Sequence, residues 1–543
     1  MICFFANSLW LAGCIPEHTR FRRAVGRVEK EQEAVLLRIV HENAGTEFGK
    51  AHGFSSIHSA TKYQRSVPLR SFDQFEAWVD RAAAGEPNVL TREAVRLFEP
   101  TGGSSGATKL IPYTRALERE FQRGIHAWIA DLFLDDPGLL SGQAYWSVSP
   151  ICETRKRTPG GIAIGFDDDT TYVGGWQKRL VNAVMAVPRT VRLASDPLTS
   201  SIEAFRYASL FFLVRSGNLR LISIWSPTFL SLLTERLAEW GERIVYDLAH
   251  GTMCPPEVRR SCEVHAALRL GSPQETHAKL WPHLGLISCW GDGNAQAPAA
   301  NLSALFPHAR VQRKGLISTE AFVSFPIAAH DNAALSVRSH FFEFLPDGLD
   351  RPQLAHQLEC GGLYSLVVTT GGGLYRYLLG DQIQVTGHIQ ECPLVRFVGR
   401  QDSVSDWFGE KLNDAHVSRV FEATFNRLNI SPSFAILACD TVPPPGYLLY
   451  IDADVNDDLL ARAAEAIDTG LRENYHYDYA RRLGQLECVR AIRVPDGAKT
   501  FSDDAARNGQ RLGDIKVPAL DRRSAGSGAF SSWTDKDDRT ESS

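Results

Sequence analysis

A run of glycine and hydroxyl residues that ends on a lysine most constrains what this chain can fold into. It reads TGGSSGATK over residues 101–109 and is followed by Leu110. Glycines let backbone N–H groups approach an anion closely, hydroxyls donate further hydrogen bonds, and a lysine supplies positive charge for a triphosphate. A Walker A loop needs Ser or Thr directly after its lysine, so that pattern fails here. The run predicts a phosphate-binding loop of another type, with a solvated loop as the alternative. The candidate ligands are Thr101, Ser104, Ser105, Gly106 and Lys109.

Length and composition indicate a large globular protein. The chain has 543 residues, of which 44% are hydrophobic and 22% charged. At roughly 150 residues per domain, two or three domains are expected. The net charge of −5 gives no broad electrostatic reason to bind nucleic acid or an anionic membrane. Ten cysteines without a Cys-x-x-Cys pair indicate neither a zinc site nor a disulfide framework, so we expect a reducing, cytoplasmic setting.

The N-terminal stretch of residues 2–15 is apolar and must be weighed as an export signal or a buried helix. It lacks a basic start, contains Asn7 and Ser8, and runs into Pro16. These flanks favour a buried helix over a signal peptide. No later apolar run approaches the ~20 residues that a membrane helix needs, so no membrane association is expected.

The remaining chain alternates between two kinds of hydrophobic spacing. Residues 21–43 and 113–134 have apolar residues at helical spacing. The second of these follows the glycine-rich run, so the free N–H groups at its start are expected to face the bound anion. Short β-rich runs then alternate with helical ones, which indicates an α/β fold. The strands are expected at residues 219–225, 363–369, 395–398 and 447–451, and the helices at residues 227–240 and 457–474.

A second group of candidate residues lies between residues 374 and 402. Asp381 follows a glycine at an expected strand end, where a carboxylate can accept hydrogen bonds from both hydroxyls of a ribose. Arg400 also follows a glycine and can reach the same sugar or its phosphate. Tyr377 belongs to the same group. Ordinary turns are the alternative interpretation of each Gly-Asp or Gly-Arg pair.

Two further motifs carry charged side chains. Ser318 and Thr319 precede Glu320, whose carboxylate can hold Mg²⁺ against phosphate oxygens, although a surface carboxylate is the simpler interpretation. Lys516 lies in a glycine-punctuated segment, where it can swing over a bound carboxylate and neutralise the charge that develops during attack on an α-phosphorus. An exposed lysine without a role is the alternative.

In this order, the motifs resemble those of the superfamily of acyl-CoA synthetases, peptide-synthetase adenylation domains and luciferases. Within it the chain most resembles the auxin-responsive acyl acid amido synthetases, also called the Gretchen Hagen family. The matching stretches are KLIPYT at 109–114, IWSPTFL at 224–230, FEFLP at 342–346 and GLYRY at 373–377. Residues 159–162 and 290–294 look like bacterial members. The resemblance extends over roughly residues 5 to 520.

The resemblance implies a two-step ligase that uses ATP and Mg²⁺. A small carboxylic acid and ATP give an acyl-adenylate and pyrophosphate, and the amine of an amino acid then displaces AMP to form an amide. It implies that Lys516 and Glu320 are catalytic, with Mg²⁺ near Glu320. The implied nucleotide ligands are Thr101, Ser104, Ser105, Gly106, Lys109, Ser318, Thr319, Tyr377, Asp381 and Arg400. The acyl pocket is expected near Phe121, Arg123 and Trp225.

The implied architecture is a large N-terminal α/β domain and a smaller C-terminal lid, with the ATP site between them. The large domain is expected over residues 1–401, the lid over 402–521, a hinge at Asp402, and a disordered tail over 522–543, where Ser, Gly and charged residues dominate. A monomer is expected. Three positions depart from the superfamily pattern: Gly102 replaces a serine, Leu316 an aromatic residue, and Asp406 a lysine.

Other functions remain open at this point. A ligase that transfers the acyl group to the thiol of CoA shares the whole adenylation half. A non-catalytic acyl- or nucleotide-binding protein on the same fold is the alternative from another class, although Lys109, Asp381 and Lys516 are all present. A P-loop kinase or ATPase is disfavoured by the failed Walker pattern. The identities of the acid and of the amino acid do not follow from motifs, because pocket shape decides specificity.

Overall fold

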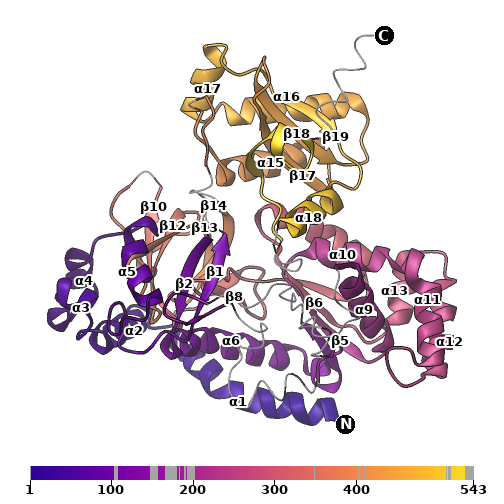
Figure 1. The fold of residues 1–543 in the computed structure, drawn as a ribbon, viewed down its shortest axis with the longest axis horizontal. Coiled ribbons are helices and arrows are strands. Elements are labelled where there is room, and N and C mark those ends of the chain that lie inside the picture. The colour runs from indigo at the N-terminus through magenta and orange to yellow at the C-terminus, as the bar shows by residue number, and fades with distance from the viewer. Residues whose placement is uncertain are drawn as a thin grey trace. The chain divides into compact units, whose positions relative to one another are not determined.

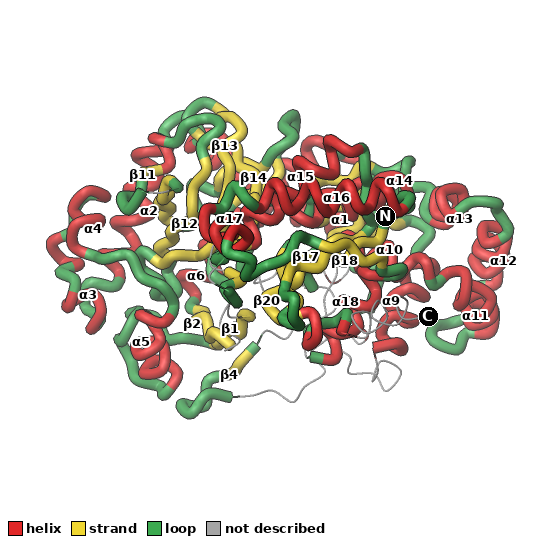
Figure 2. The backbone as a smooth tube through the Cα atoms, turned by 90° about the horizontal axis from the view of Figure 1, so that it is seen from above, coloured by secondary structure: helices red, strands yellow, loops and turns green. Residues whose placement is uncertain are grey.

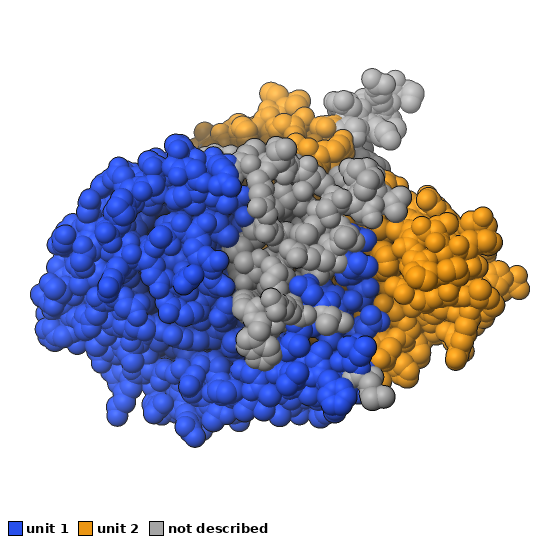
Figure 3. All heavy atoms as spheres, turned by 60° about the horizontal axis from the view of Figure 1, so that its bottom comes forward, with its two compact units in different colours: residues 1–144, 150–200, 314–397 blue, residues 145–149, 201–313, 398–543 orange. Residues whose placement is uncertain are grey.

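The computed structural model describes residues 2–102, 108–146, 157–165, 180, 182, 184–188, 191, 202–347, 349–400, 404–408, 410–508, 510 and 515–531. The chain forms two compact units (Figure 3). The first contains residues 1–144, 150–200 and 314–397, and the second contains residues 145–149, 201–313 and 398–543. Helices and strands are present in both units, so the predicted α/β class is confirmed (Figure 2).

The N-terminal part of the chain contributes helices to the first unit (Figure 1). They are α1 (Ile2–Ala24), α2 (Val28–Glu42), α3 (Glu47–Ala51), α4 (Ala60–Ser66), α5 (Asp73–Ala83) and α6 (Arg115–Asp135). The predicted N-terminal helix is present as α1, which lies along α6 and packs Trp10 edge-on against Phe133 with 5.8 Å between ring centroids. Its other face exposes Phe5 and Leu9.

The helical spacing over residues 21–43 falls on two helices, the end of α1 and the whole of α2. Residues 25–27 separate α1 from α2, because the chain turns at Gly26. A Cβ atom there would lie 2.3 Å from Oε1 of Gln390, so a larger residue would have to displace the end of that side chain. The apolar spacing continues across this turn, which is why periodicity did not reveal the break.

The first unit is built on a seven-stranded, mostly antiparallel sheet of order β11-β10-β12-β13-β14-β9-β8. Its strands are β8 (Ser324–Pro326), β9 (Ala333–Leu335), β10 (Phe341–Pro346), β11 (Gln353–Leu354), β12 (Leu363–Thr369), β13 (Tyr377–Ile389) and β14 (Cys392–Arg400). A smaller sheet of order β2-β1-β4 contains β1 (Leu97–Gly102), β2 (Thr108–Tyr113) and β4 (Ala163–Ile164). The strands expected at 363–369 and 395–398 are confirmed as β12 and part of β14.

The glycine-rich run connects two strands. β1 pairs with β2 as an antiparallel hairpin in which Thr101 lies opposite Lys109. β2 therefore separates the run from α6, and the prediction that the run leads directly into a helix N-terminus is wrong. The helix begins only after Thr114, whose hydroxyl accepts a hydrogen bond from the N–H of Leu117 and caps the first turn.

The described residues of the second unit form two four-stranded sheets and one short two-stranded pair. Parallel strands β5 (Leu219–Ser223), β6 (Leu286–Cys289) and β7 (Arg310–Arg313) form one sheet with β3 (Gln143–Trp146) at its edge. The helices of this part are α9 (Ile202–Arg215), α10 (Pro227–Glu235), α11 (Leu237–His250), α12 (Val258–Leu268), α13 (Pro273–Leu280) and α14 (Gln296–Leu305). The predicted helix over 227–240 is present as α10 and the start of α11, and the strand expected at 219–225 is β5.

The C-terminal part of the second unit surrounds a four-stranded sheet of order β19-β18-β17-β20. The strands are β17 (Phe434–Asp440), β18 (Gly446–Asp452), β19 (Arg490–Arg493) and β20 (Leu520–Ser524), with the short pair β15 (Val404–Ser405) and β16 (Leu412–Asn413) beside them in sequence. The helices are α15 (Asp414–Leu428), α16 (Asp457–Leu471), α17 (Tyr475–Arg482) and α18 (Gly497–Arg507).

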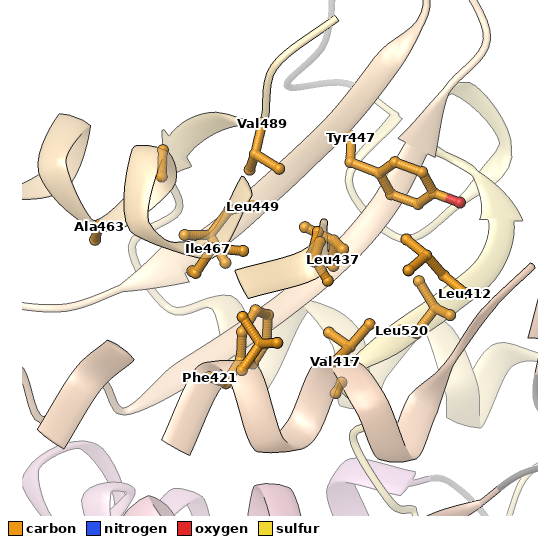
Figure 4. Close-up of a cluster of buried hydrophobic side chains, with 14 of the residues drawn as sticks. Leu412, Val417, Phe421, Leu437, Tyr447, Leu449, Ala463, Ile467, Val489 and Leu520 are labelled. Atoms are coloured by element: carbon orange, nitrogen blue, oxygen red, sulfur yellow. The ribbon is translucent and has the colours of Figure 1, made fainter. Parts of the chain in front are cut away.

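Both faces of this sheet are buried, because alternate residues of its strands point to opposite sides. Leu437 and Leu449 join the cluster of Figure 4, together with Phe421 of α15 and Ile467 of α16. Ile436 and its neighbours on the other face join a second cluster near α18. The strand expected at 447–451 and the helix expected at 457–474 are confirmed as β18 and α16.

The predicted disordered tail begins too early. β20 pairs in parallel with β17, and farther along the chain the Phe530 ring stacks on Tyr450 with 4.9 Å between centroids. The prediction is therefore wrong for residues 522–531. This segment is polar in composition, but it contains the end of β20 and the buried Phe530. Residues 532–543 lie outside the described residues. Within the described part of the chain, no helix has the length and apolar character needed to cross a membrane.

Candidate functional site

The hairpin of β1 and β2 carries the first candidate residues. Thr101 and Lys109 are partly buried and lie opposite each other, and the Lys109 ammonium lies 5.7 Å from the centroid of the Phe72 ring. A cation over an aromatic face is attracted by the ring quadrupole. The candidates Ser104, Ser105 and Gly106 lie outside the described residues.

Residues Ser318 to Ala321 form a tight turn. The Ser318 N–H donates to the Ala321 carbonyl at 3.0 Å, and the Ala321 N–H donates back to the Ser318 hydroxyl at 3.1 Å. The Tyr113 hydroxyl, at the end of β2, donates to the Thr319 carbonyl at 2.5 Å. Glu320 is only 7% exposed, so the interpretation as an ordinary surface carboxylate is wrong.

Tyr377 and Asp381 both lie in β13 and both are buried. Val367 of β12 pairs with Leu378, whereas Ser365 pairs with Gln382, so β13 contains extra residues at this point and forms a bulge. Gly380 has a φ of 84°, which lets the strand bulge and continue. Asp381 therefore lies in a bulge within a long strand, and the prediction of a strand end is wrong.

Two other candidates of the second unit, Trp225 and Lys516, lie against the ring of Trp290. The aromatic rings of Trp225 and Trp290 pack with 5.6 Å between centroids, and the Lys516 ammonium lies 4.1 Å from the Trp290 ring centroid. Lys516 is an exposed residue. The sequence predicts an acyl-pocket role for Trp225 and a catalytic role for Lys516. In the structure both side chains contact Trp290.

Arg400 ends β14 and lies near a buried carboxylate at the start of α15. The Asp414 carboxylate accepts hydrogen bonds from the N–H groups of Ala519 at 2.7 Å and Leu520 at 3.0 Å. Burial raises the pKa of Asp414, while these bonds and the charge of Arg400 oppose that shift. Asp414 thus fixes the chain three residues after Lys516. The expected hinge residue Asp402 lies outside the described residues.

The two pocket candidates on α6 are packed side chains. Phe121 is 1% exposed, and its ring lies 5.9 Å from that of Tyr113 and 6.2 Å from that of Phe322. Arg123 donates to the Arg338 carbonyl at 3.3 Å, and burial lowers the pKa of Arg123 to about 10. Their contribution to an acyl pocket stays a prediction.

The donor set at Glu320 suits Mg²⁺ held jointly with a nucleotide. Among the described residues, no three His, Cys, Asp or Glu side chains gather as a metal cage. Mg²⁺ commonly binds through one or two carboxylates together with substrate phosphates and water. A single buried carboxylate beside a serine and a threonine therefore fits this ion.

The sequence did not predict two buried contacts between an acidic and a basic side chain. Glu120 of α6 bonds to His340, and Arg376 bonds to Glu343 of β10. Arg376 and Glu343 each stand in a stretch that resembles the amido synthetase family, but their 33-residue separation hides the contact. No local signal marks the Glu120–His340 contact, since 220 residues separate its members.

Three domain models of one protein family match this chain in order. The GH3 family N-terminal domain matches residues 17–311, the GH3 family central domain matches residues 333–400, and the GH3 family C-terminal domain matches residues 415–525. The chain belongs to the GH3 family. The predicted family is thereby confirmed.

Relatives of this GH3 protein cover most of its length. It is 24% identical to "Indole-3-acetic acid-amido synthetase GH3.8" of Oryza sativa subsp. indica, over 90% of this chain and 88% of the relative. It is 22% identical to "Indole-3-acetic acid-amido synthetase GH3.3" of Arabidopsis thaliana, over 90% and 89% respectively. Both are plant proteins, so the likeness to bacterial members stays a prediction.

Solved GH3 structures share the fold. The structure described as "AtGH3.15 acyl acid amido synthetase in complex with 2,4-DB" aligns with a TM-score of 0.82 at 17% sequence identity, covering 96% of each chain. At this identity the match concerns the fold alone. It agrees with the α/β architecture of the two units.

Proposed function

We propose that this GH3 protein is an ATP-dependent acyl acid amido synthetase, a ligase that forms amide bonds between a small carboxylic acid and an amino acid. The observation that carries the proposal is the match of three GH3 domains, in order, along residues 17–525. The retention of Lys109, Glu320, Asp381 and Lys516 supports a catalytic member over a silent binding protein.

In the first step, a carboxylate oxygen of the acid attacks the α-phosphorus of ATP. A new P–O bond forms to the acid, the bond to the β-phosphate oxygen breaks, and pyrophosphate leaves. Lys516 stabilises the negative charge that develops at the α-phosphate. Lys109, Ser104 and Ser105 bind the β- and γ-phosphates, and Glu320 would hold Mg²⁺, which would supply positive charge beside the leaving group.

The other candidate residues bind the nucleoside and the acyl group. Asp381 accepts hydrogen bonds from the ribose hydroxyls, and Arg400 assists at the sugar or phosphate. The burial of Asp381, at 4% exposure, supports a directed carboxylate over a solvated turn. The further nucleotide contacts come from Thr101, Gly106, Ser318, Thr319 and Tyr377, and the acyl contacts from Phe121, Arg123 and Trp225.

In the second step, the neutral amine of an amino acid attacks the acyl carbon. The C–N bond forms, the bond from carbon to the AMP oxygen breaks, and the amine loses a proton to solvent. This attack needs mainly a positioned, uncharged amine, because the adenylate is already activated.

We also propose the domain bounds, cellular location and oligomeric state that the sequence predicts. A large domain over residues 1–401 and a lid over 402–521 turn about Asp402, in a cytoplasmic monomer. Nine cysteines within the described residues are free thiols, which supports a reducing setting.

The test is pyrophosphate release from Mg-ATP by the purified protein across a panel of aromatic and aliphatic acids. Each acid is offered with mixed amino acids, with CoA, or with neither. Sustained release that needs both acid and amino acid, with an amide detected by mass spectrometry, supports the proposal. Release that needs CoA instead assigns the protein to the thioester ligases, and no release under any condition favours a silent binder.

Lys516→Ala tests the catalytic assignment. Adenylation is expected to fall about 10²–10³-fold, as typically follows removal of one transition-state donor, while the Kd for ATP stays within about threefold. Lys499→Ala is the matched control, because Lys499 is also an exposed lysine of the second unit. Equal adenylation rates in the two variants would remove Lys516 from the mechanism.

A further inference from the structure

A buried acid and a buried histidine of the first unit contact each other and bond to the backbone of two turns. Glu120 is 2% exposed and His340 is fully buried. Nδ1 of His340 lies 2.9 Å from Oε2 of Glu120, and the N–H of Phe322 donates to Nε2 of the same ring at 3.0 Å. A backbone N–H can only donate, so Nε2 carries no proton and Nδ1 carries it. His340 is therefore a neutral imidazole that donates to the Glu120 carboxylate.

The same carboxylate holds a second piece of backbone. The N–H of Gly371 donates to Oε2 of Glu120 at 2.9 Å. Arg38 lies 3.5 Å from the other carboxylate oxygen and supplies an opposite charge. The buried carboxylate is thus satisfied by two donors and one cation, which is what a charge in a low-dielectric interior requires.

Both captured N–H groups belong to segments that carry candidate site residues. Phe322 lies two residues after Glu320 and closes the turn through a bridge with Ile317. Gly371 lies in the turn between β12 and β13, six residues before Tyr377. Glu120 therefore holds the segment of Glu320, the proposed Mg²⁺ ligand, indirectly through His340. It holds the segment that leads to Asp381, the proposed ribose ligand, by its own hydrogen bond to Gly371.

The junction of β2 and α6 holds the carbonyls of the same two turns. The Tyr113 hydroxyl donates to the Thr319 carbonyl at 2.5 Å, and the Thr114 hydroxyl donates to the Gly371 carbonyl at 2.8 Å. Tyr113, Thr114 and Glu120 lie within two helical turns of one another in sequence. The β2–α6 junction thus holds the carbonyl of each turn, while Glu120 holds the N–H of Gly371 directly and that of Phe322 through His340.

We propose that Glu120 is a positioning residue that, partly through His340, holds the 318–322 turn and the 370–373 turn in register with the β2–α6 junction. This inference rests on the proposed function, because the two turns matter for adenylation only if they carry its ligands. Glu120 is assigned to act through His340 and the Gly371 N–H. A displacement of about 1 Å at a reacting centre can cost about 10²-fold in rate, so the loss of this fixed register is expected to reduce turnover strongly.

The same helix offers a matched control. Asp131 of α6 is 9% exposed, its carboxylate accepts from the Ala328 N–H at 2.6 Å, and it pairs with His18 at 3.2 Å. Like Glu120, it is a helical acid bonded to one histidine and one backbone N–H. It differs in that neither partner adjoins a candidate ligand.

The experiment compares Glu120→Ala, Glu120→Gln, Asp131→Ala and wild type by thermal unfolding, by kcat and KM for pyrophosphate release, and by amide hydrogen exchange. Glu120→Ala is expected to lower kcat about 10²-fold at temperatures well below unfolding. Glu120→Gln, whose amide oxygen can accept both bonds at Oε2, is expected to recover kcat to within about tenfold of wild type. Asp131→Ala is expected to lose stability without a comparable loss of kcat.

Hydrogen exchange tests the inference separately from activity. The Phe322 and Gly371 amides are expected to exchange faster in Glu120→Ala by about tenfold or more, and to keep wild-type protection in Asp131→Ala. If wild type releases no pyrophosphate with any acid, the proposed function fails, and exchange still decides whether Glu120 holds the two turns. Unchanged exchange at both amides, or equal kcat losses in Glu120→Ala and Asp131→Ala, would overturn the inference. If Glu120→Ala does not fold, His340→Asn takes its place, since it can still donate to Glu120 but leaves the Phe322 N–H unpaired.

Discussion

Replacement of Arg376 by methionine is expected to destabilise the first unit by about 3–5 kcal/mol, which is the usual cost of breaking a buried ion pair from one side. Arg376 is 5% exposed and Glu343 is fully buried. Nε of Arg376 donates to both carboxylate oxygens of Glu343, at 3.2 and 2.9 Å, and Nη2 adds a third bond at 2.9 Å. The substitution leaves the carboxylate charged, buried and without its cation.

The double variant Arg376→Met with Glu343→Leu separates charge from packing. It removes the orphaned carboxylate but leaves the Gln64 and Val67 carbonyls without the Nη1 donor, and the Gln64 side-chain amide with only its longer bond to the Pro352 carbonyl. At about 1 kcal/mol for each of these three groups, the double variant is expected to lose about 2–3 kcal/mol. The second substitution is therefore expected to restore stability to the first.

The assay is calorimetric and urea unfolding at neutral pH. A loss of 3–5 kcal/mol corresponds to a Tm shift of about 6–20 °C for a unit of this size. Arg493→Met is the control, because Arg493 pairs at 2.9 Å with Asp457, which is 98% exposed, and such surface pairs contribute at most about 1 kcal/mol. A double variant less stable than Arg376→Met would refute the reasoning, since it would mean that the buried carboxylate needs no cation.

Two further predictions concern packing and pH. In Gly124→Ala, the added Cβ would lie 2.1 Å from a ring carbon of Phe322, so a stability loss of about 1–3 kcal/mol is expected in thermal unfolding, whereas Gly45→Ala, with no atom within 4 Å, should change little. Burial lowers the pKa of His277 from 6.5, so the unfolded state binds more protons below pH 6.5 and stability is lost as pH falls through that region. His277→Phe is expected to flatten the dependence of the unfolding free energy on pH between about 7.5 and 5, and an unchanged slope would contradict the assignment.

The sequence predicted elements with strong periodicity well. The helix expected over 113–134 is α6, Arg115–Asp135, because its apolar face repeats over five turns and Thr114 provides a cap. The segment after Asp521 was mispredicted, because β20 is polar and its pairing with β17 is decided by neighbours far away in sequence. Local composition carries no record of such a partner.

The candidate site shows the same division. Its motifs were found because glycine, hydroxyl and charged residues occur at recognisable spacings, and GH3 membership agrees with their order. The sequence did not predict which side chains hold those motifs in place. Glu120 reads as one more helical acid, and only the fold reveals that it lies against His340 and Gly371. Tertiary hydrogen bonds between residues hundreds of positions apart have no spacing to recognise.

The bonds of Asp414 to Ala519 and Leu520 set a limit on how far Lys516 can travel. An extended chain spans at most about 3.6 Å per residue, so three residues allow the Lys516 Cα to move no more than about 11 Å from the Ala519 anchor. While β20 stays paired with β17, the Lys516 Cα stays within this distance of a fixed point on the C-terminal sheet. The position of the C-terminal sheet therefore limits where the Lys516 ammonium can lie, and any movement of the sheet moves the lysine with it.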